Sequence, residues 1–139
     1  MAAKLQIEFQ VSKSDIPLLI SDRLSSLLKS KSDQIPPAYA CNKEKLVFII
    51  FEKADKKLKE YISSLDPDKT ANIAYISVFG KDTDVLADIS RGLGVNVVEP
   101  YNVGVKKGFF GSKLTEEELN GAIEYAKKTA EGLFESLHL

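Results

Sequence analysis

An unbroken apolar run near the middle of the chain constrains the fold most strongly. Residues 46–51, Leu-Val-Phe-Ile-Ile-Phe, contain no polar side chain. A strand with one solvated face alternates apolar and polar residues, whereas a continuous run is typical of a strand covered on both faces. Strands of that kind lie in parallel sheets with helices packed on each side. The run therefore predicts an α/β protein with this segment as a central parallel strand.

Two hydrophobic periods alternate along the rest of the sequence. Residues 5–11 have period 2 and predict a first strand with one polar face, while residues 16–30 have helical spacing, with Leu19 among the inward positions. Val85 is placed inward in a later helix in the same way. The further elements expected are a helix at 54–65, a strand at 71–79, a helix at 84–93, a strand from 95 to 98 and a helix from 115 to about 137.

The connection at residues 31–42 is polar and contains Pro36 and Pro37. Because proline confines a strand to a sheet edge, we expect at most a short edge strand here, near Ala38, Tyr39 and Ala40. Strands that alternate with helices form right-handed βαβ units and a mainly parallel sheet. The pattern predicts a doubly wound, three-layer α/β fold.

Composition predicts one domain, residues 1–139, with 44% hydrophobic and 28% charged residues. A net charge of −1, from 19 basic and 20 acidic residues, favours neither a nucleic-acid partner nor an anionic membrane. A single cysteine, Cys41, fits a reducing compartment, and we expect it to be half-buried and unreactive. Without an apolar run of ~20 residues or a signal-peptide pattern, we expect a cytoplasmic protein with no membrane partner.

Two helix starts carry capping signals. Thr115 followed by Glu118 forms a capping-box pattern before the last helix. Asp15 or Ser14 is expected to cap the first helix, and Pro17 suits its first turn.

The loop before that first helix is the first candidate site. Residues 12–17, Ser-Lys-Ser-Asp-Ile-Pro, follow the first strand, where ligands of open α/β sheets bind and a helix N-terminus holds anions. Ser12 and Ser14 offer hydroxyls and Lys13 a positive charge. The loop has no glycine, however, and it contains the acid Asp15 and the N–H-less Pro17.

Several segments together resemble the flavodoxin family. They are the central strand at 45–51, the segment Asn-Ile-Ala-Tyr-Ile-Ser-Val-Phe-Gly at 72–80, the Leu-Gly-Val-Asn-Val-Val junction at 93–98 and the Phe-Phe-Gly-Ser-Lys-Leu-Thr-Glu-Glu-Glu-Leu segment at 109–119. The resemblance covers most of the chain in element order. It implies strand order 2-1-3-4-5, here with a short or missing second strand, and it implies a flavin mononucleotide (FMN) cofactor used in electron transfer.

The resemblance also implies which residues would hold FMN. Ser12, Lys13 and Ser14 match the family's phosphate loop, and Phe51, Phe79, Gly80 and Tyr101 would lie near the flavin ring. In that match Asp15 replaces a glycine and Pro17 replaces a hydroxyl.

The substitutions in the phosphate loop argue against tight FMN binding. Two unit charges ~4 Å apart at an effective dielectric of about 20 repel by about 4 kcal/mol, so Asp15 would oppose a phosphate. The more direct expectation is that Asp15 caps the helix and closes the corner itself. The loops at 52–55 and 80–84 are short and charged and supply no obvious ring platform, and Asp82 or Asp84 is expected to cap the helix that follows.

Two functions remain open. One is a degenerate family member that has lost tight FMN binding and serves as a binding or interaction module for a protein or redox partner. The other is an FMN-binding electron-transfer protein, with a flavin reductase as a lesser alternative. The loop at 101–111, with Phe109 and Phe110, is the best remaining binding surface. No catalytic residue is assigned, because the lone His138 leaves no Ser-His-Asp set.

Overall fold

The computed structural model describes residues 4–108 and 111–134. Its elements in chain order are β1 (Leu5–Phe9), α1 (Ile16–Leu28), β2 (Ser32–Gln34), β3 (Glu44–Phe51), α2 (Lys56–Ile62), β4 (Thr70–Ser77), α3 (Thr83–Gly92), β5 (Asn96–Val97), β6 (Tyr101–Asn102), β7 (Lys107–Gly108), β8 (Gly111–Ser112) and α4 (Glu116–Leu133). The main sheet runs β2-β1-β3-β4-β5, with β6 also paired to β4, and all these pairs are parallel. The structure is therefore the expected α/β fold with a mainly parallel sheet.

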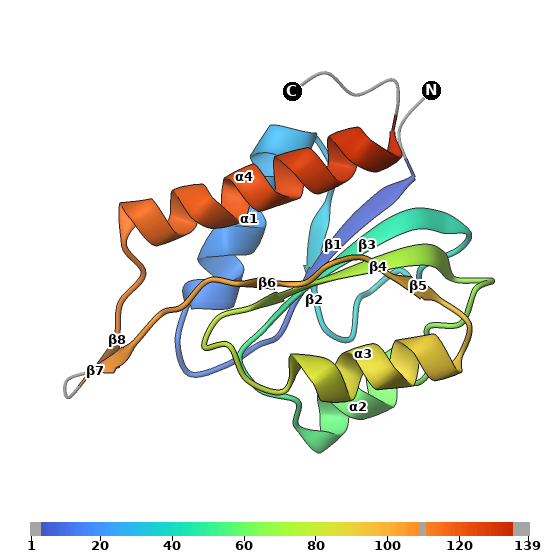
Figure 1. Cartoon of the computed structure of the whole chain (residues 1–139), viewed down its shortest axis with the longest axis horizontal. Helices are drawn as coiled ribbons and strands as arrows, with labels where there is room; N and C mark the ends of the chain where they lie inside the picture. Colours follow the sequence, from blue (N-terminus) through green and yellow to red (C-terminus); the bar gives the residue numbers. More distant parts are fainter. Residues whose placement is uncertain (1–3, 109–110, 135–139) are drawn as a thin grey trace.

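The sheet is the middle of three layers (Figure 1). Helices α1 and α4 cover one face and α2 and α3 cover the other. Along β3, Leu46, Phe48 and Ile50 pack in the first core and alternate with residues of the second, Val47, Ile49 and Phe51, all fully buried. This confirms that the apolar run is a central strand covered on both faces.

The second strand is misplaced by the sequence prediction. The edge strand forms at Ser32–Gln34, with Ile7 opposite Ser32, and not at residues 38–40. Tyr39 is 80% exposed. As the edge strand, β2 pairs with β1 alone, so its polar side chains can stay in contact with solvent. The strand ends because the two prolines that follow have no N–H with which to continue the hydrogen-bond ladder.

The last strand is divided in two. The sequence predicts a strand from 95 to 98, but β5 covers only Asn96–Val97, and Tyr101–Asn102, expected to start a loop, forms β6. Both pieces pair with β4, at Ile73 and Ile76 respectively. Pro100 lies between them, and a residue without an N–H cannot continue the pairing.

The helices form where the periodicity predicts them, with ends shifted by a few residues. The prediction that Leu19 and Val85 point inward is wrong, because they are 48% and 44% exposed. The predicted end of α4 near Leu137, together with His138, lies outside the described residues. No helix in the described ranges is long and apolar enough to cross a membrane.

Of the two capping predictions, the one for α4 is confirmed and the one for Asp15 at the start of α1 is wrong. The capping box of Thr115 and Glu118 is confirmed, with the Glu118 N–H donating to Thr115 Oγ1 at 3.1 Å. The expectation for Asp15 is wrong: it holds the N-cap position of α1, but its side chain makes no capping hydrogen bond. Ser14 Oγ instead accepts from the Ile16 N–H, at 3.3 Å.

Candidate binding cleft at the carboxyl edge of the sheet

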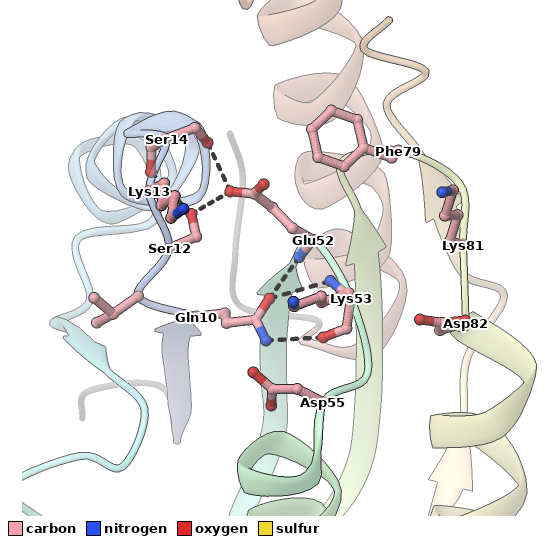
Figure 2. A pocket seen from close by; sticks show the side chains of 11 residues that line it. Gln10, Ser12, Lys13, Ser14, Glu52, Lys53, Asp55, Phe79, Lys81 and Asp82 are labelled. Carbon is pink, nitrogen blue, oxygen red and sulfur yellow. Dashed lines mark hydrogen bonds between the residues drawn. The ribbon is translucent and has the colours of Figure 1, made fainter. Parts of the chain in front are cut away.

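A cleft of about 960 Å³ opens at the carboxyl ends of β1, β3 and β4 (Figure 2). Three loops supply its walls, and the lining residues are Gln10, Val11, Ser12, Lys13 and Ser14 after β1, Glu52, Lys53 and Asp55 after β3, and Phe79, Lys81 and Asp82 after β4. Small-molecule pockets commonly enclose roughly 300–1,000 Å³. The cleft also lies where the sheet order reverses, between β1 and β3, which is the usual ligand position in open α/β sheets.

One corner of the cleft lies at the start of α1, beside Ser12 and Ser14, where the sequence predicts a bound phosphate. A carboxylate of the protein itself already fills this corner. Ser14 Oγ donates to Glu52 Oε1 at 2.6 Å, and Ser12 Oγ makes a close contact with the same oxygen. Figure 2 shows the Glu52 side chain reaching from the loop after β3 to the two serines before α1. Both hydroxyls that the sequence marks as phosphate ligands therefore contact Glu52, and Ser12 Oγ also donates to the Ser14 carbonyl at 2.9 Å.

Glu52 also interacts with the start of α1 through Ser14. The Ile16 N–H donates to Ser14 Oγ, and that hydroxyl in turn donates to Glu52. The first turn of a helix carries unpaired N–H groups and a partial positive charge, which attract an anion. The Glu52 carboxylate supplies this negative charge from within the chain.

Gln10 holds the loop that carries Glu52. Its Oε1 accepts from the backbone N–H groups of Glu52, at 2.8 Å, and Lys53, at 3.2 Å. Its Nε2 donates to the Lys53 carbonyl at 2.8 Å, and the side chain is buried, with 7% of the residue exposed. Because one amide satisfies three backbone groups, the backbone at 52–53 is fixed relative to β1.

Two aspartates fix the loops after β3 and β4, which form the rest of the cleft wall. Asp55 caps α2, since its Oδ1 accepts from the Leu58 N–H at 2.8 Å. Asp82 does not cap α3 with its side chain, contrary to expectation; its Oδ2 accepts from the Ala54 N–H at 3.0 Å and so joins the loops after β4 and β3. All three loops of the cleft are thus tied to one another by side chains.

The charges around the cleft balance. Its lining residues include three lysines, at 13, 53 and 81, and three acids, at 52, 55 and 82. Lys13, Lys53 and Lys81 are exposed. The lining therefore has no excess of positive side chains that would draw in a phosphate, because the lysines are matched in number by carboxylates.

The structure brings together only part of the predicted FMN site. Ser12, Lys13, Ser14 and Phe79 all line the cleft. Phe51 does not: it is fully buried and makes an edge-to-face contact with Tyr75, 6.1 Å between ring centroids. The alternation of side chains along β3 turns this residue toward α2 and α3, away from the cleft.

The other two predicted ring neighbours have structural roles. Tyr101 stacks on Tyr125 of α4, with ring centroids 5.1 Å apart. Gly80 adopts φ +74°, and a Cβ there would meet the Asn102 side chain at 2.4 Å. The turn at the end of β4 therefore requires glycine for its backbone and its close neighbour.

Asp15 is not the residue that closes the corner. It is exposed and does not line the cleft, whereas Glu52 lines it and contacts both serines. The sequence patterns assign no role to Glu52 or Gln10. The signals that could have found them are an acid directly after the central strand and a polar residue at the end of the first strand.

The loop at 101–111 does not cover the cleft with its described residues. Val103 and Val105 are buried, at 8% and 4% exposed, and pack in the core beneath α1 and α4. Phe109 and Phe110, expected to anchor the loop, lie outside the described residues. The binding role of this loop therefore stays a prediction.

Two other kinds of site are absent from the described part of the chain. No group of three or more His, Cys, Asp or Glu side chains is arranged to hold a metal ion there. Cys41 is more buried than expected, at 2% exposed, and burial raises the pKa of its thiol far above the ordinary value. A thiol that stays protonated is a poor nucleophile.

Comparison of the chain with protein-family models gives no match, and comparison with curated proteins gives none either. The class of protein that the structure defines is thus an α/β domain with a parallel sheet and a strand-end cleft. The resemblance to flavodoxins stays a prediction from sequence.

Proposed function

We propose that this protein is a flavodoxin-like binding module that has lost tight FMN binding because Glu52 takes the place of the cofactor's phosphate. One observation carries the proposal: the hydroxyls of Ser12 and Ser14 both contact Glu52 Oε1. A phosphate at this corner would have to displace the carboxylate or lie beside it.

Both routes are costly. Displacement breaks charge-assisted hydrogen bonds, each contributing about 1.5–3 kcal/mol. Coexistence brings two negative charges together, at a cost of about 4 kcal/mol for ~4 Å and an effective dielectric of about 20. Either penalty lowers affinity by about a hundredfold or more.

The ring side of the cleft supports the same proposal. Of the three aromatics expected near a flavin, only Phe79 lines the cleft. A planar ring gains most when it is held on both faces, and stacking of one aromatic pair contributes about 0.5–1.5 kcal/mol. The residues present therefore do not fit a tightly held FMN.

The binding surface of the module is the rim of the cleft. It presents Lys13, Lys53 and Lys81 beside Asp55 and Asp82. Alternating charges of this kind favour a partner of complementary charge pattern and give specificity more than affinity. We infer a protein or redox-protein partner in the cytoplasm.

The alternative function is an FMN-binding electron-transfer protein. The position of the cleft at the reversal of the strand order and the presence of Phe79 at its wall favour it. In such a protein the flavin supplies the redox chemistry, and the chain binds and orients it.

A titration of FMN against purified protein, followed by flavin fluorescence, separates the two functions. We expect no quenching at high-micromolar FMN for the wild type and measurable binding for Glu52→Ala. Asp15→Asn is the matched control, because it removes an exposed acid from the same loop without changing the serines or Glu52, and it should behave as the wild type. A yellow wild-type preparation with tight quenching would overturn the proposal and favour the FMN-binding alternative instead.

A further inference from the structure

A second polar cluster lies on the opposite side of β1 from α1 and centres on Glu8. This carboxyl is fully buried, at 0% exposed. Tyr61 of α2 donates to its Oε1 at 2.5 Å, Gln6 Nε2 donates to its Oε2 at 2.9 Å, and Cys41 Sγ lies 3.5 Å from the same oxygen. The cluster is separate from the cleft, since none of these residues lines it.

No positive charge among the described residues forms an ion pair with Glu8. The charged groups that face it from the neighbouring strands are both acidic, Asp33 of β2 and Glu44 of β3. Burial raises the pKa of Glu8 to about 7, while the hydrogen bonds from Tyr61 and Cys41 partly oppose the shift.

The segment that covers this carboxyl is held by two buried side chains and a few hydrogen bonds, which at its ends include Ile35 N–H to the Phe9 carbonyl and Lys43 N–H to the Asp68 carbonyl. Residues 35–43, called here the strap, connect β2 to β3 and contain no helix or strand. Ile35 and Cys41 are its two buried anchors, at 5% and 2% exposed, and the chain between them is largely exposed. Its middle is tied by the Ala38 N–H to Asp33, at 2.7 Å, and by Gln6 to the Tyr39 carbonyl, at 3.3 Å. Segments with few buried contacts open more readily than the core.

We propose that the strap is a proton-controlled cover: it stays closed over Glu8 while this carboxyl is neutral, and it opens more readily once the carboxyl ionises. Opening admits water to the carboxylate and exposes Cys41. The physical drive is the cost of a buried, unpaired charge beside two further acids, which solvation relieves.

The direction of the pH effect follows from proton binding. The closed form holds the Glu8 proton up to a pKa of about 7, whereas a solvated carboxyl releases it near the ordinary pKa of 4.5. The open fraction therefore rises about tenfold per pH unit between these two values and levels off above the higher one. The substitution Glu8→Gln removes the effect, because the amide has no proton to release in this range.

Cys41 reports the opening, because it is the only cysteine of the chain. Its rate of reaction with dithiodipyridine is measured from pH 5 to pH 8 in wild type and in Glu8→Gln. Each rate is divided by that of the same protein unfolded in denaturant at the same pH, which removes the intrinsic chemistry of the thiol. We expect the wild-type ratio to rise about fortyfold between about pH 5 and pH 7 and less than about twofold further by pH 8, and the Glu8→Gln ratio to stay flat.

Urea separates opening of the strap from unfolding of the whole domain. Local opening exposes little surface, so the reaction rate should change little at urea concentrations below the unfolding transition. A rate that follows urea with the slope of global unfolding overturns the proposal, and so does a pH profile shared by wild type and Glu8→Gln.

Tyr61→Phe provides a second variant, whose outcome holds even where Glu8→Gln fails to fold. Loss of the Tyr61 hydroxyl removes a hydrogen bond that lowers the pKa of Glu8. The level portion of the pH profile should then begin at higher pH than in wild type. An unshifted profile overturns the proposal.

Discussion

Ser14 Oγ donates to Glu52 Oε1 at 2.6 Å, and this contact joins the loop that opens α1 to the loop that follows the central strand. A corner that in sequence resembles a phosphate site is thereby satisfied within the chain. The acid that does this lies 38 residues away from the serine. Glu52, and not the adjacent Asp15, is consequently the residue on which ligand preference should depend.

The contact between Glu52 and the serines predicts how the cleft treats the flavin phosphate. We expect wild type to bind FMN no better than riboflavin, because the phosphate gains nothing at an occupied corner. In Glu52→Ala, FMN should bind at least about tenfold more tightly than riboflavin, a difference of about 1.4 kcal/mol. Parallel fluorescence titrations with the two flavins measure this ratio. Equal, measurable affinities in Glu52→Ala would show that the phosphate gains nothing once Glu52 is removed, which contradicts the proposal, whereas no binding of either flavin would show that the ring side limits binding.

Gln10→Leu should destabilise the fold. The substitution keeps the approximate size of the side chain but leaves two N–H groups and one carbonyl at 52–53 without their partner. We expect a loss of about 1–3 kcal/mol in the free energy of unfolding, measured by urea titration. Gln10→Glu, which keeps an acceptor for the two N–H groups, should lose less; an equal loss would contradict the role given to Oε1.

The stability of the protein should fall as pH rises from about 4.5 to 7. Folding raises the pKa of Glu8 from 4.5 to about 7, so the folded state binds this proton more tightly than the unfolded chain does. The contribution of Glu8 to the free energy of unfolding is fully present below the pKa of the unfolded chain and is lost once the pH reaches the pKa of the folded state. The loss is about 1.36 kcal/mol per pKa unit, or about 3 kcal/mol in all. Urea unfolding across this range, with Glu8→Gln as the pH-independent reference for this group, measures it. A difference between the two proteins that does not change with pH would argue against it.

Thr115→Ala should destabilise α4 by about 0.5–2 kcal/mol, because it removes the side chain that caps the Glu118 N–H. Thermal or urea unfolding measures the loss. Thr115→Ser is the matched control, since it retains the hydroxyl, and should stay within a few tenths of a kcal/mol of the wild type.

Gly80→Ala should lower stability by more than about 1 kcal/mol, since φ is +74° and the new Cβ would meet Asn102 at 2.4 Å. Gly132→Ala is the control: it lies in α4, where an added Cβ would have no such neighbour within 4 Å, and it should be neutral or slightly stabilising. Equal effects at the two glycines in urea unfolding would contradict the geometric explanation.

Local sequence patterns predict an element well where a strand is buried on both faces or where a helix cap involves residues only a few positions apart. The apolar run at 46–51 does lie at the centre of the sheet, and the Thr115 capping box does open α4. Both features depend on residues that are neighbours in sequence. The edges of the sheet are less predictable, since β2 consists of polar residues that carry no strand pattern of their own and form a strand by pairing with β1.

The candidate site likewise has features that the sequence predicts and features that only the packing of the folded chain decides. The sequence alone specifies the α/β layering, the loop of Ser12 and Ser14 at the end of the first strand, and the absence of a glycine there. The packing of the folded chain is what brings Glu52 into the corner, lets Gln10 hold its loop, and turns Phe51 and Tyr101 elsewhere. The physical reason is that a hydrogen bond between two loops depends on the register of β1 against β3, which no local period encodes.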